Sequence, residues 1–251
     1  MISYQLYSSR NFPPTGDTLR MLESAGYDAV EGFGGVYPDE ASATPLAADL
    51  ATIGLTMPTG HFSIDALESD PAQVIRMART LGMDTIICPW IPPEMRPTDA
   101  AGWTAFGKRL AVAGKSVREA GLAFGWHNHD FEFVALPTGE LPHDLLFAAA
   151  PDLGWEIDVA WVVKGGQDPV PFIHTYADRI LTAHVKDIAP AGEKADEDGW
   201  ADVGTGIVNW AAAYAALRNA SCTRFIMEHD NPSDHARFAR ASIATVKGWM
   251  A

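Results

Sequence analysis

The sequence predicts an α/β protein with a single (β/α)₈ barrel, and three observations favour this fold class. Short apolar runs typical of strands alternate with longer amphipathic or Ala-rich stretches along the whole chain, as in repeated βα units. Eight such units fit within 251 residues, a normal size for this barrel. Several helix candidates end in Ala-Gly, Leu-Gly or Ile-Gly just before the next strand, where glycine permits a sharp turn.

The expected strands are short apolar runs bounded by turn residues. They span Ile2–Leu6, Ala29–Gly32, Thr56–Gly60, Thr85–Pro89, Ala123–His127, Leu153–Asp158, Ile180–Val185 and Phe225–Glu228. The rival arrangement is an open doubly wound sheet, which would carry a Gly-rich phosphate turn after its first strand. The segment QLYSSRNFPP at that place contains no glycine, so the closed barrel over residues 1–251 is favoured.

The expected helices lie between these strands, at Thr15–Ser24, Glu40–Ile53, Pro71–Leu81, Thr98–Ala120, His143–Ala149, Pro169–Tyr176, Trp210–Ala220 and His235–Met250. Asp70 and Pro71 form an N-cap and first-position pair, and Gly26, Gly54 and Gly82 follow helix ends. The polar stretch 192–202 predicts one long loop. The glycines of DVGTGIVNW lack the GxxxxGK[ST] pattern, so a turn is preferred to a phosphate loop.

Charge and cysteine content exclude several partners. The chain has 32 acidic and 18 basic residues and a net charge of −14, so it has no electrostatic reason to approach nucleic acid or anionic lipid. Its two cysteines, Cys88 and Cys222, have no metal-ligand or redox spacing and predict buried thiols in a reducing compartment. With no apolar run of ~18 residues and no signal segment, we expect a soluble cytoplasmic protein.

Residues able to bind a metal or move a proton recur where the predicted strands end, which is where active sites of such barrels gather. Taken singly, a strand-end Asp is usually a turn or cap residue and a buried His a core residue. However, Asp158, His184 and Glu228 occupy equivalent positions on three successive strands. Together they predict a divalent metal site, whose fourth ligand lies among four residues of the fifth-strand segment: His127, His129, Asp130 and Glu132.

The runs WHNHDFEF, EIDVAWVVKGGQDP, RILTAHVKD, DVGTGIVNW and IMEHD resemble the sugar phosphate isomerase/epimerase family, which has a xylose isomerase-like barrel and includes inosose dehydratase-like members. The resemblance covers most of residues 120–232. It implies a metal bound by a Glu after strand five, an Asp on strand six, a His on strand seven and a Glu on strand eight. Asp158, His184 and Glu228 would take the last three roles. Many relatives carry the first glutamate where this chain has His127, and the resemblance transfers that role to Glu132.

A ligand set rich in oxygen with one imidazole suits Mn²⁺, the first expectation, or Mg²⁺, Co²⁺ or Zn²⁺. Such a metal polarises the carbonyl of a keto-sugar or polyol, so that a base can remove the adjacent proton through an enediolate. We predict Glu132, Glu228, His127 and His129 as proton carriers. We predict His61, Trp90, Trp161 and Lys186 as substrate-binding residues, and Trp200 as part of a lid.

The residues leave other outcomes open. Loss of water or an alcohol would make the protein a dehydratase or lyase. The histidines of HNH slightly favour this outcome, because an imidazole near a metal can protonate a leaving oxygen. A displaced strand-five ligand also permits a non-catalytic sugar sensor or a subunit that needs a partner. DNA-repair endonucleases of the same barrel type need a basic face, which a charge of −14 disfavours. We expect a small sugar or polyol as the partner, and a homodimer is compatible with this fold.

Overall fold

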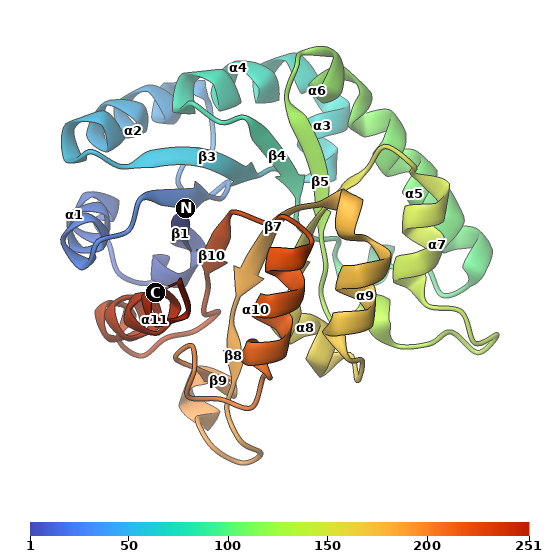
Figure 1. The fold of residues 1–251 in the computed structure, drawn as a ribbon. Helices are drawn as coiled ribbons and strands as arrows, with labels where there is room; N and C mark the ends of the chain where they lie inside the picture. Colours follow the sequence, from blue (N-terminus) through green and yellow to red (C-terminus); the bar gives the residue numbers. More distant parts are fainter. Residues whose placement is uncertain (251) are drawn as a thin grey trace.

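The computed structural model describes residues 1–250, where parallel strands close into a barrel surrounded by helices (Figure 1). In these residues eight strands form the barrel in the order β1-β10-β7-β6-β5-β4-β3-β2, and β1 pairs with both β2 and β10. The strands are β1 Ile2–Gln5, β2 Ala29–Gly32, β3 Thr56–His61, β4 Thr85–Cys88, β5 Ala123–His127, β6 Gly154–Asp158, β7 Ile180–Val185 and β10 Phe225–Met227. The predicted (β/α)₈ fold is confirmed.

Every expected strand is present, and no end differs from the prediction by more than one residue. The small differences have local causes. β1 stops at Gln5 because its side chain accepts a hydrogen bond from Tyr7 N, which starts a 3₁₀ turn. β4 stops at Cys88 because Pro89 has no N–H to donate to a strand ladder.

The flanking helices are α1 Thr15–Ala25, α2 Glu40–Ile53, α3 Ile64–Ser69, α4 Pro71–Leu81, α5 Ala100–Ala113, α6 Lys115–Glu119, α7 Pro142–Ala149, α8 Val159–Lys164, α9 Pro169–Thr175, α10 Trp210–Asn219 and α11 His235–Met250. The single helix predicted over Thr98–Ala120 is wrong, because the chain breaks at Gly114 into α5 and α6. A Cβ on Gly114 would lie 2.1 Å from a ring carbon of Phe124. None of the helices in residues 1–250 combines the length and hydrophobicity needed to cross a membrane.

Predicted helix ends agree with the observed caps. The carboxylate of Asp70 accepts a hydrogen bond from Gln73 N, and Pro71 occupies the first turn of α4. Gly26, Gly54 and Gly82 adopt positive φ angles of 88°, 91° and 77° at the ends of α1, α2 and α4. In that left-handed region an L side chain is strained, so glycine allows each helix to turn directly into the next strand.

The stretch predicted as one long loop after β7 contains a short antiparallel hairpin, β8 Asp187–Ile188 paired with β9 Trp200–Ala201. The carboxylate of Asp187 then organises the glycine-containing segment that follows. It accepts hydrogen bonds from the backbone N–H groups of Gly204, Gly206 and Val208 at 2.9–3.1 Å. Since a carboxylate of the protein occupies these amides, the segment is a turn, as the sequence favoured.

Close contact between α5 and α7 depends on Gly107. A Cβ at this position would lie 2.5 Å from the carbonyl oxygen of Leu146. We therefore expect Gly107→Ala to lower the free energy of unfolding by about 1–3 kcal/mol, because α7 must move to relieve the clash. Urea unfolding followed by circular dichroism measures the change.

Gly248→Ala is the matched control, because Gly248 lies in α11 and a Cβ added there would have no neighbouring atom within 4 Å. There alanine is expected to stabilise the helix by about 0.5–1 kcal/mol. Equal effects at the two sites would contradict the close packing of α5 against α7.

Candidate metal centre and active site

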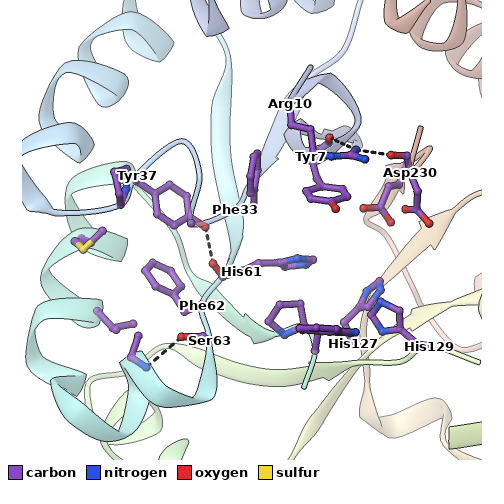
Figure 2. Close-up of a pocket in the computed structure, with 18 of the residues that line it drawn as sticks. Tyr7, Arg10, Phe33, Tyr37, His61, Phe62, Ser63, His127, His129 and Asp230 are labelled. Atoms are coloured by element: carbon purple, nitrogen blue, oxygen red, sulfur yellow. Dashed lines mark hydrogen bonds between the residues drawn. The ribbon is translucent and has the colours of Figure 1, made fainter. Parts of the chain in front are cut away.

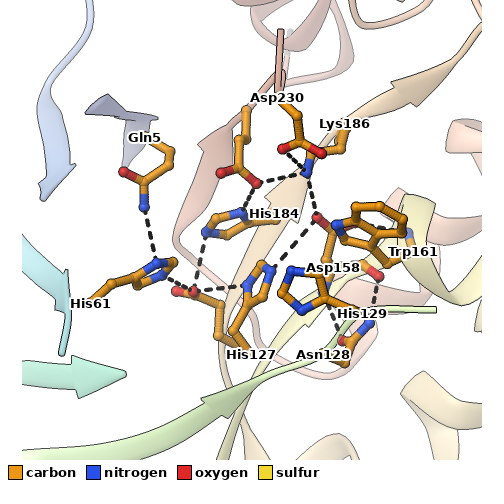
Figure 3. Close-up of polar contacts among 12 residues, drawn as sticks. Gln5, His61, His127, Asn128, His129, Asp158, Trp161, His184, Lys186 and Asp230 are labelled. Carbon is orange, nitrogen blue, oxygen red and sulfur yellow. Dashed lines mark hydrogen bonds and ion pairs between the residues drawn. The ribbon is translucent and has the colours of Figure 1, made fainter. Parts of the chain in front are cut away.

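Ionisable side chains converge inside the barrel at the carboxyl ends of its strands (Figure 3). Residues two apart on a strand share a face, so Glu156 and Asp158 of β6 lie on one face, as do His184 and Lys186 at the end of β7. The strand register places His127 beside Glu156 and Asp158 beside His184. All five side chains are buried.

The deeper part of the cluster is an imidazole–glutamate network formed by Glu31, His61, His127, Glu156 and His184. One oxygen of Glu156, Oε1, lies 2.7 Å from His61 Nε2, 3.1 Å from His127 Nδ1 and 3.1 Å from His184 Nε2. Its other oxygen accepts a hydrogen bond from Thr182 Oγ1 at 2.7 Å. A single carboxylate therefore joins side chains of three other strands.

Glu31 on β2 forms the second half of this network. Its Oε1 lies 2.7 Å from His184 Nε2 and 3.1 Å from His61 Nε2, and it accepts a hydrogen bond from Gln5 Nε2 at 2.8 Å. An ionised carboxylate only accepts hydrogen bonds, so His127 Nδ1 and His184 Nε2 must carry N–H. His127 Nε2 is thereby left to act as a ligand when the ring is neutral. His184 Nδ1 also faces a carboxylate oxygen, Glu228 Oε2 at 2.9 Å, so it carries a proton that a bound cation would displace.

Opposite charges in this network offset the cost of burial. Burial alone would lower the pKa of His61, but the carboxylates of Glu31 and Glu156 raise it to about 10. Burial also opposes the charge of Glu156, yet His184 and His61 hold its pKa well below the usual range. The network consequently persists as paired charges in the interior of the barrel.

Nearer the mouth lies a second group, the four-residue set His127, Asp158, His184 and Glu228. Each offers one ligand atom, and these atoms lie within 4.8 Å of one another. His184 Nδ1 is 2.9 Å from Glu228 Oε2, and His127 Nε2 is 4.0 Å from Asp158 Oδ2. The structure therefore brings together the three ligand candidates at the ends of β6, β7 and β10, and adds His127 from the end of β5.

Asp158 serves two purposes at once. Its Oδ1 accepts a hydrogen bond from Trp161 N at 2.9 Å and caps α8, while its buried Oδ2 has no hydrogen-bond partner. Asn128 fixes the backbone here, because its side chain accepts from Asp158 N and donates to Asp158 O. Asp158 therefore does act as a helix cap, as a strand-end Asp usually does. Its second oxygen, Oδ2, remains directed at the other three members of the four-residue set.

Glu132, to which the resemblance transferred the first ligand role, lies outside the four-residue set. Its Oε1 accepts a hydrogen bond from Trp126 Nε1 at 2.8 Å and its Oε2 accepts from His129 N at 2.9 Å. Burial raises the pKa of Glu132 to about 8, although these two hydrogen bonds act in the opposite direction. Both oxygens hydrogen-bond within the β5 segment itself, so the structure does not bring Glu132 together with the other predicted ligands.

Lys186 is a buried cation among three carboxylates. Its Nζ lies 2.7 Å from Asp230 Oδ1, 2.9 Å from Glu228 Oε2 and 3.4 Å from Asp158 Oδ2. Burial would lower the pKa of Lys186, but Asp230, Glu228 and Asp158 raise it instead. The ammonium therefore stays charged and offsets the negative charge beside the four-residue set.

A cavity of about 770 Å³ opens over this cluster (Figure 2). Three of the predicted substrate-binding residues, His61, Trp90 and Lys186, line it, as do His127, His129 and Glu228. His129 is neutral, because burial and the charges of His127 and Lys186 hold its pKa well below the usual range. Its buried Nδ1 has no hydrogen-bond partner.

Two predicted aromatic residues have other positions. Trp161 is not among the residues that line the cavity; its ring packs against Trp200 with centroids 4.8 Å apart. Trp200 itself is 2% exposed. Trp200 is therefore packed beside Trp161 of α8 and does not form the predicted lid, whereas Asp198 of the same hairpin lines the cavity.

Sequence reasoning missed Glu156, Gln5 and Asp230. For Glu156 a signal was present, since it precedes Asp158 by two residues and must share its inward face. Gln5 and Asp230 each follow or end an apolar run, but neither residue type identifies a site without its spatial neighbours.

The comparisons with known proteins agree with this architecture. Residues 19–249 match the family model of the xylose isomerase-like TIM barrel. The rhizopine catabolism protein MocC of Rhizobium meliloti is 25% identical over 193 residues, which make up 70% of this chain and 58% of that protein. This chain therefore aligns with less than two thirds of the relative's length.

Solved structures show the same fold at low identity. A sugar phosphate isomerase/epimerase from Parabacteroides distasonis superposes with a TM-score of 0.82 at 19% identity, covering 98% of this chain and 93% of that one. The IolI protein, solved with a zinc atom, superposes with a TM-score of 0.78 at 13% identity, covering 98% and 96%. The family resemblance predicted from the strand-end motifs is confirmed: the chain belongs to the xylose isomerase-like TIM barrel family.

Proposed function

We propose that this protein is a divalent-metal-dependent sugar isomerase or epimerase, which moves a proton next to the carbonyl of a keto-sugar or related polyol through an enediolate. The observation that carries the proposal is the four-residue set His127, Asp158, His184 and Glu228 at the base of a large cavity. The names of the family and of the Parabacteroides structure support the same class of substrate.

The four-residue set fits a metal better than the deeper network does. Asp158 Oδ2 is buried without a hydrogen-bond partner, and Lys186 Nζ, 3.4 Å away, lies closer to Asp230 and Glu228 than to this oxygen. In contrast, Glu156 Oε1 already faces three imidazole nitrogens. We assign His127, Asp158, His184 and Glu228 as the residues that would hold the ion.

The donor set also bears on the identity of the ion. Two imidazoles and two carboxylates suit Zn²⁺, Mn²⁺ or Co²⁺ better than Mg²⁺, which prefers oxygen ligands and water. The zinc atom in the IolI structure is consistent with this choice. When bound, such an ion acts as a Lewis acid that polarises a carbonyl oxygen of the substrate.

The residues around the cavity supply the proton transfers. His129 lies at the cavity wall with a buried Nδ1 that has no hydrogen-bond partner, so this nitrogen is placed to accept a proton, and the lowered pKa of the ring means that it would pass the proton on readily. Asp230, with a pKa raised by burial, lines the cavity beside Lys186 and comes from the segment after β10. Two proton carriers from different strand ends permit epimerisation, and one carrier acting between adjacent carbons permits isomerisation.

The metal assignment predicts different results for His127 and Glu132. We expect His127→Ala to lower the affinity for Zn²⁺ or Mn²⁺ by more than the roughly 10–100-fold that loss of an outer partner costs. Glu132→Gln is expected to leave the affinity within a few-fold, because Glu132 lies outside the set. Isothermal titration calorimetry of the folded variants measures both, and loss of binding only in the Glu132 variant would restore the assignment made from the sequence.

The imidazole–glutamate network predicts a role for Glu156 as a positioning residue. Glu156→Gln keeps the shape of the side chain but removes the charge that faces His127 Nδ1 and His184 Nε2 and orients the two rings. We expect the affinity for Zn²⁺ to fall roughly 10–100-fold while circular dichroism shows a folded barrel. Thr182→Val, which removes only the hydroxyl that hydrogen-bonds Glu156 Oε2, should have a smaller effect; unchanged affinity in Glu156→Gln would contradict the role.

Proton exchange tests the proposed reaction. Metal-loaded protein incubated in D₂O with a panel of ketoses, 3-keto-glycosides and inososes should incorporate deuterium next to the carbonyl, as followed by NMR. We expect His129→Asn to slow exchange about 10²–10⁴-fold while metal affinity is retained. Glu228→Gln should lose both deuterium exchange and metal affinity. Removal of the metal should stop exchange in the unaltered protein.

The products distinguish the alternatives. Exchange with no group lost identifies an isomerase or epimerase, whereas an unsaturated product identifies a dehydratase or lyase. Absence of exchange with every compound, in protein that binds metal, would favour a non-catalytic sugar-binding protein.

A further inference from the structure

One of the three carboxylates that line the described cavity has no partner in the protein. Glu228 and Asp230 lie 2.9 Å and 2.7 Å from Lys186 Nζ. Asp198, from the turn between β8 and β9, also lines the cavity. Its side chain is exposed and makes no hydrogen bond or ion pair within residues 1–250. The two oxygens of Asp198 are therefore free to accept hydrogen bonds from a ligand.

The backbone of Asp198 has a conformation that an L side chain seldom adopts. Its φ angle is 56°, and that of Lys194, four residues earlier, is 52°. Apart from glycines, Ser221 is the one other residue in the range 1–250 with a positive φ. Glycine fits such a turn without strain, as Gly199 does at a φ of 74°. A strained residue that keeps its side chain beside a cavity points to a role for that side chain in binding a ligand.

A buried ion pair holds this turn in place. Glu197, directly before Asp198, is buried. Its carboxylate accepts hydrogen bonds from Ser233 N and Arg237 Nη2, each at 2.7 Å. Arg237 of α11 also donates to Asp202 Oδ2 at 3.0 Å, just after β9. The turn is thus fixed to the segment after β10 and to α11, so Asp198 is presented from a rigid backbone and little freedom is lost when a ligand binds.

The cations of the lining are poorly placed to bind a phosphate. Two line the described cavity, Lys186 and Arg10. Lys186 already lies among three carboxylates. Nη1 of Arg10 donates to the backbone oxygens of Tyr7 and Asp230. The lining residues after β2 and β3 carry no charge. A phosphate would therefore meet only the remaining N–H groups of Arg10, in a lining that also carries the unpaired charge of Asp198.

We propose that Asp198 is a specificity-determining residue, whose carboxylate binds hydroxyl groups of an unphosphorylated sugar or polyol and repels a phosphorylated one. An ionised carboxylate accepts hydrogen bonds but cannot donate them, so it pairs with the O–H groups of a polyol and with no oxygen of a phosphate dianion. Hydrogen bonds to a charged acceptor are also stronger than those between neutral groups. This inference rests on the proposed function for the identity of the cavity as the substrate site.

Binding measurements compare neutral ligands with their phosphate esters. Titration calorimetry of the metal-loaded protein uses D-fructose with fructose 6-phosphate, and myo-inositol with inositol 1-phosphate. We expect the tighter-binding neutral compound to bind at least about tenfold more tightly than its ester. Asp198→Asn, which keeps the size of the side chain and removes its charge, should narrow this ratio at least about fivefold.

Asp196→Asn is the matched control. It removes the same charge two residues earlier, from an exposed side chain that does not line the cavity, and should keep the ratio of the unaltered protein. Tighter binding of an ester than of its neutral compound, no binding of any of the four compounds, or equal narrowing by the two Asn variants would each overturn the proposal.

Replacement by glycine separates a binding role from a structural one. Asp198→Gly removes the carboxylate and also the strain of a positive φ, so the melting temperature should rise. Binding of the neutral compound should weaken about tenfold, because hydrogen bonds to a charged group are lost. Unchanged affinity in the glycine variant, or weaker binding together with a lower melting temperature, would contradict the role of Asp198 in recognition.

The outcomes distinguish this inference from the proposed reaction, because these measurements use binding and unfolding alone. A preference for neutral ligands that depends on Asp198, in protein without deuterium exchange, would reject the reaction and leave the role of Asp198 intact. Deuterium exchange in protein whose preference is unchanged by Asp198→Asn would retain the reaction and reject the role of Asp198.

Discussion

The site depends on one buried carboxylate, that of Glu156, whose Oε1 lies within 3.1 Å of imidazole nitrogens of His61, His127 and His184 on three other strands. An ion pair this deep exists only because each charge is matched; removing one partner would leave the others uncompensated. The pairing also sets the direction of each ring, because the nitrogen that faces the carboxylate must carry the proton. The rings at the mouth are thus oriented from below, by Glu31 and Glu156, which lie outside the four-residue set.

The strand ends explain how one barrel can hold a charged network beside an uncharged part of the cavity. β5, β6, β7 and β10 supply the four-residue set, whereas the segments after β2 and β3 supply lining residues without charge. His61, at the end of β3, lies between them and is held by Glu31 and Glu156. The charged and uncharged parts of the cavity therefore correspond to opposite sides of the same ring of strands.

Most of the fold could be predicted from the sequence, because an apolar run marks each barrel strand and a glycine ends the helix before β2, β3, β4 and β5. The helices α3 and α8 were not predicted, since six residues are too few to show a helical period. The site was predicted in part. Asp158, His184 and Glu228 follow from position alone, but the choice between His127 and Glu132 depends on a 3₁₀ turn at Phe131–Phe133 that points Glu132 towards Trp126. No local pattern encodes that direction.

The division of the network between the two halves of the chain has a consequence for folding. The four-residue set lies entirely after residue 122, but Gln5, Glu31 and His61, which orient its rings, all come from the first quarter of the sequence. Neither portion alone contains a complete centre. A bound ion would therefore indicate that the whole barrel has closed. Its binding would raise the free energy of global unfolding rather than that of a local opening.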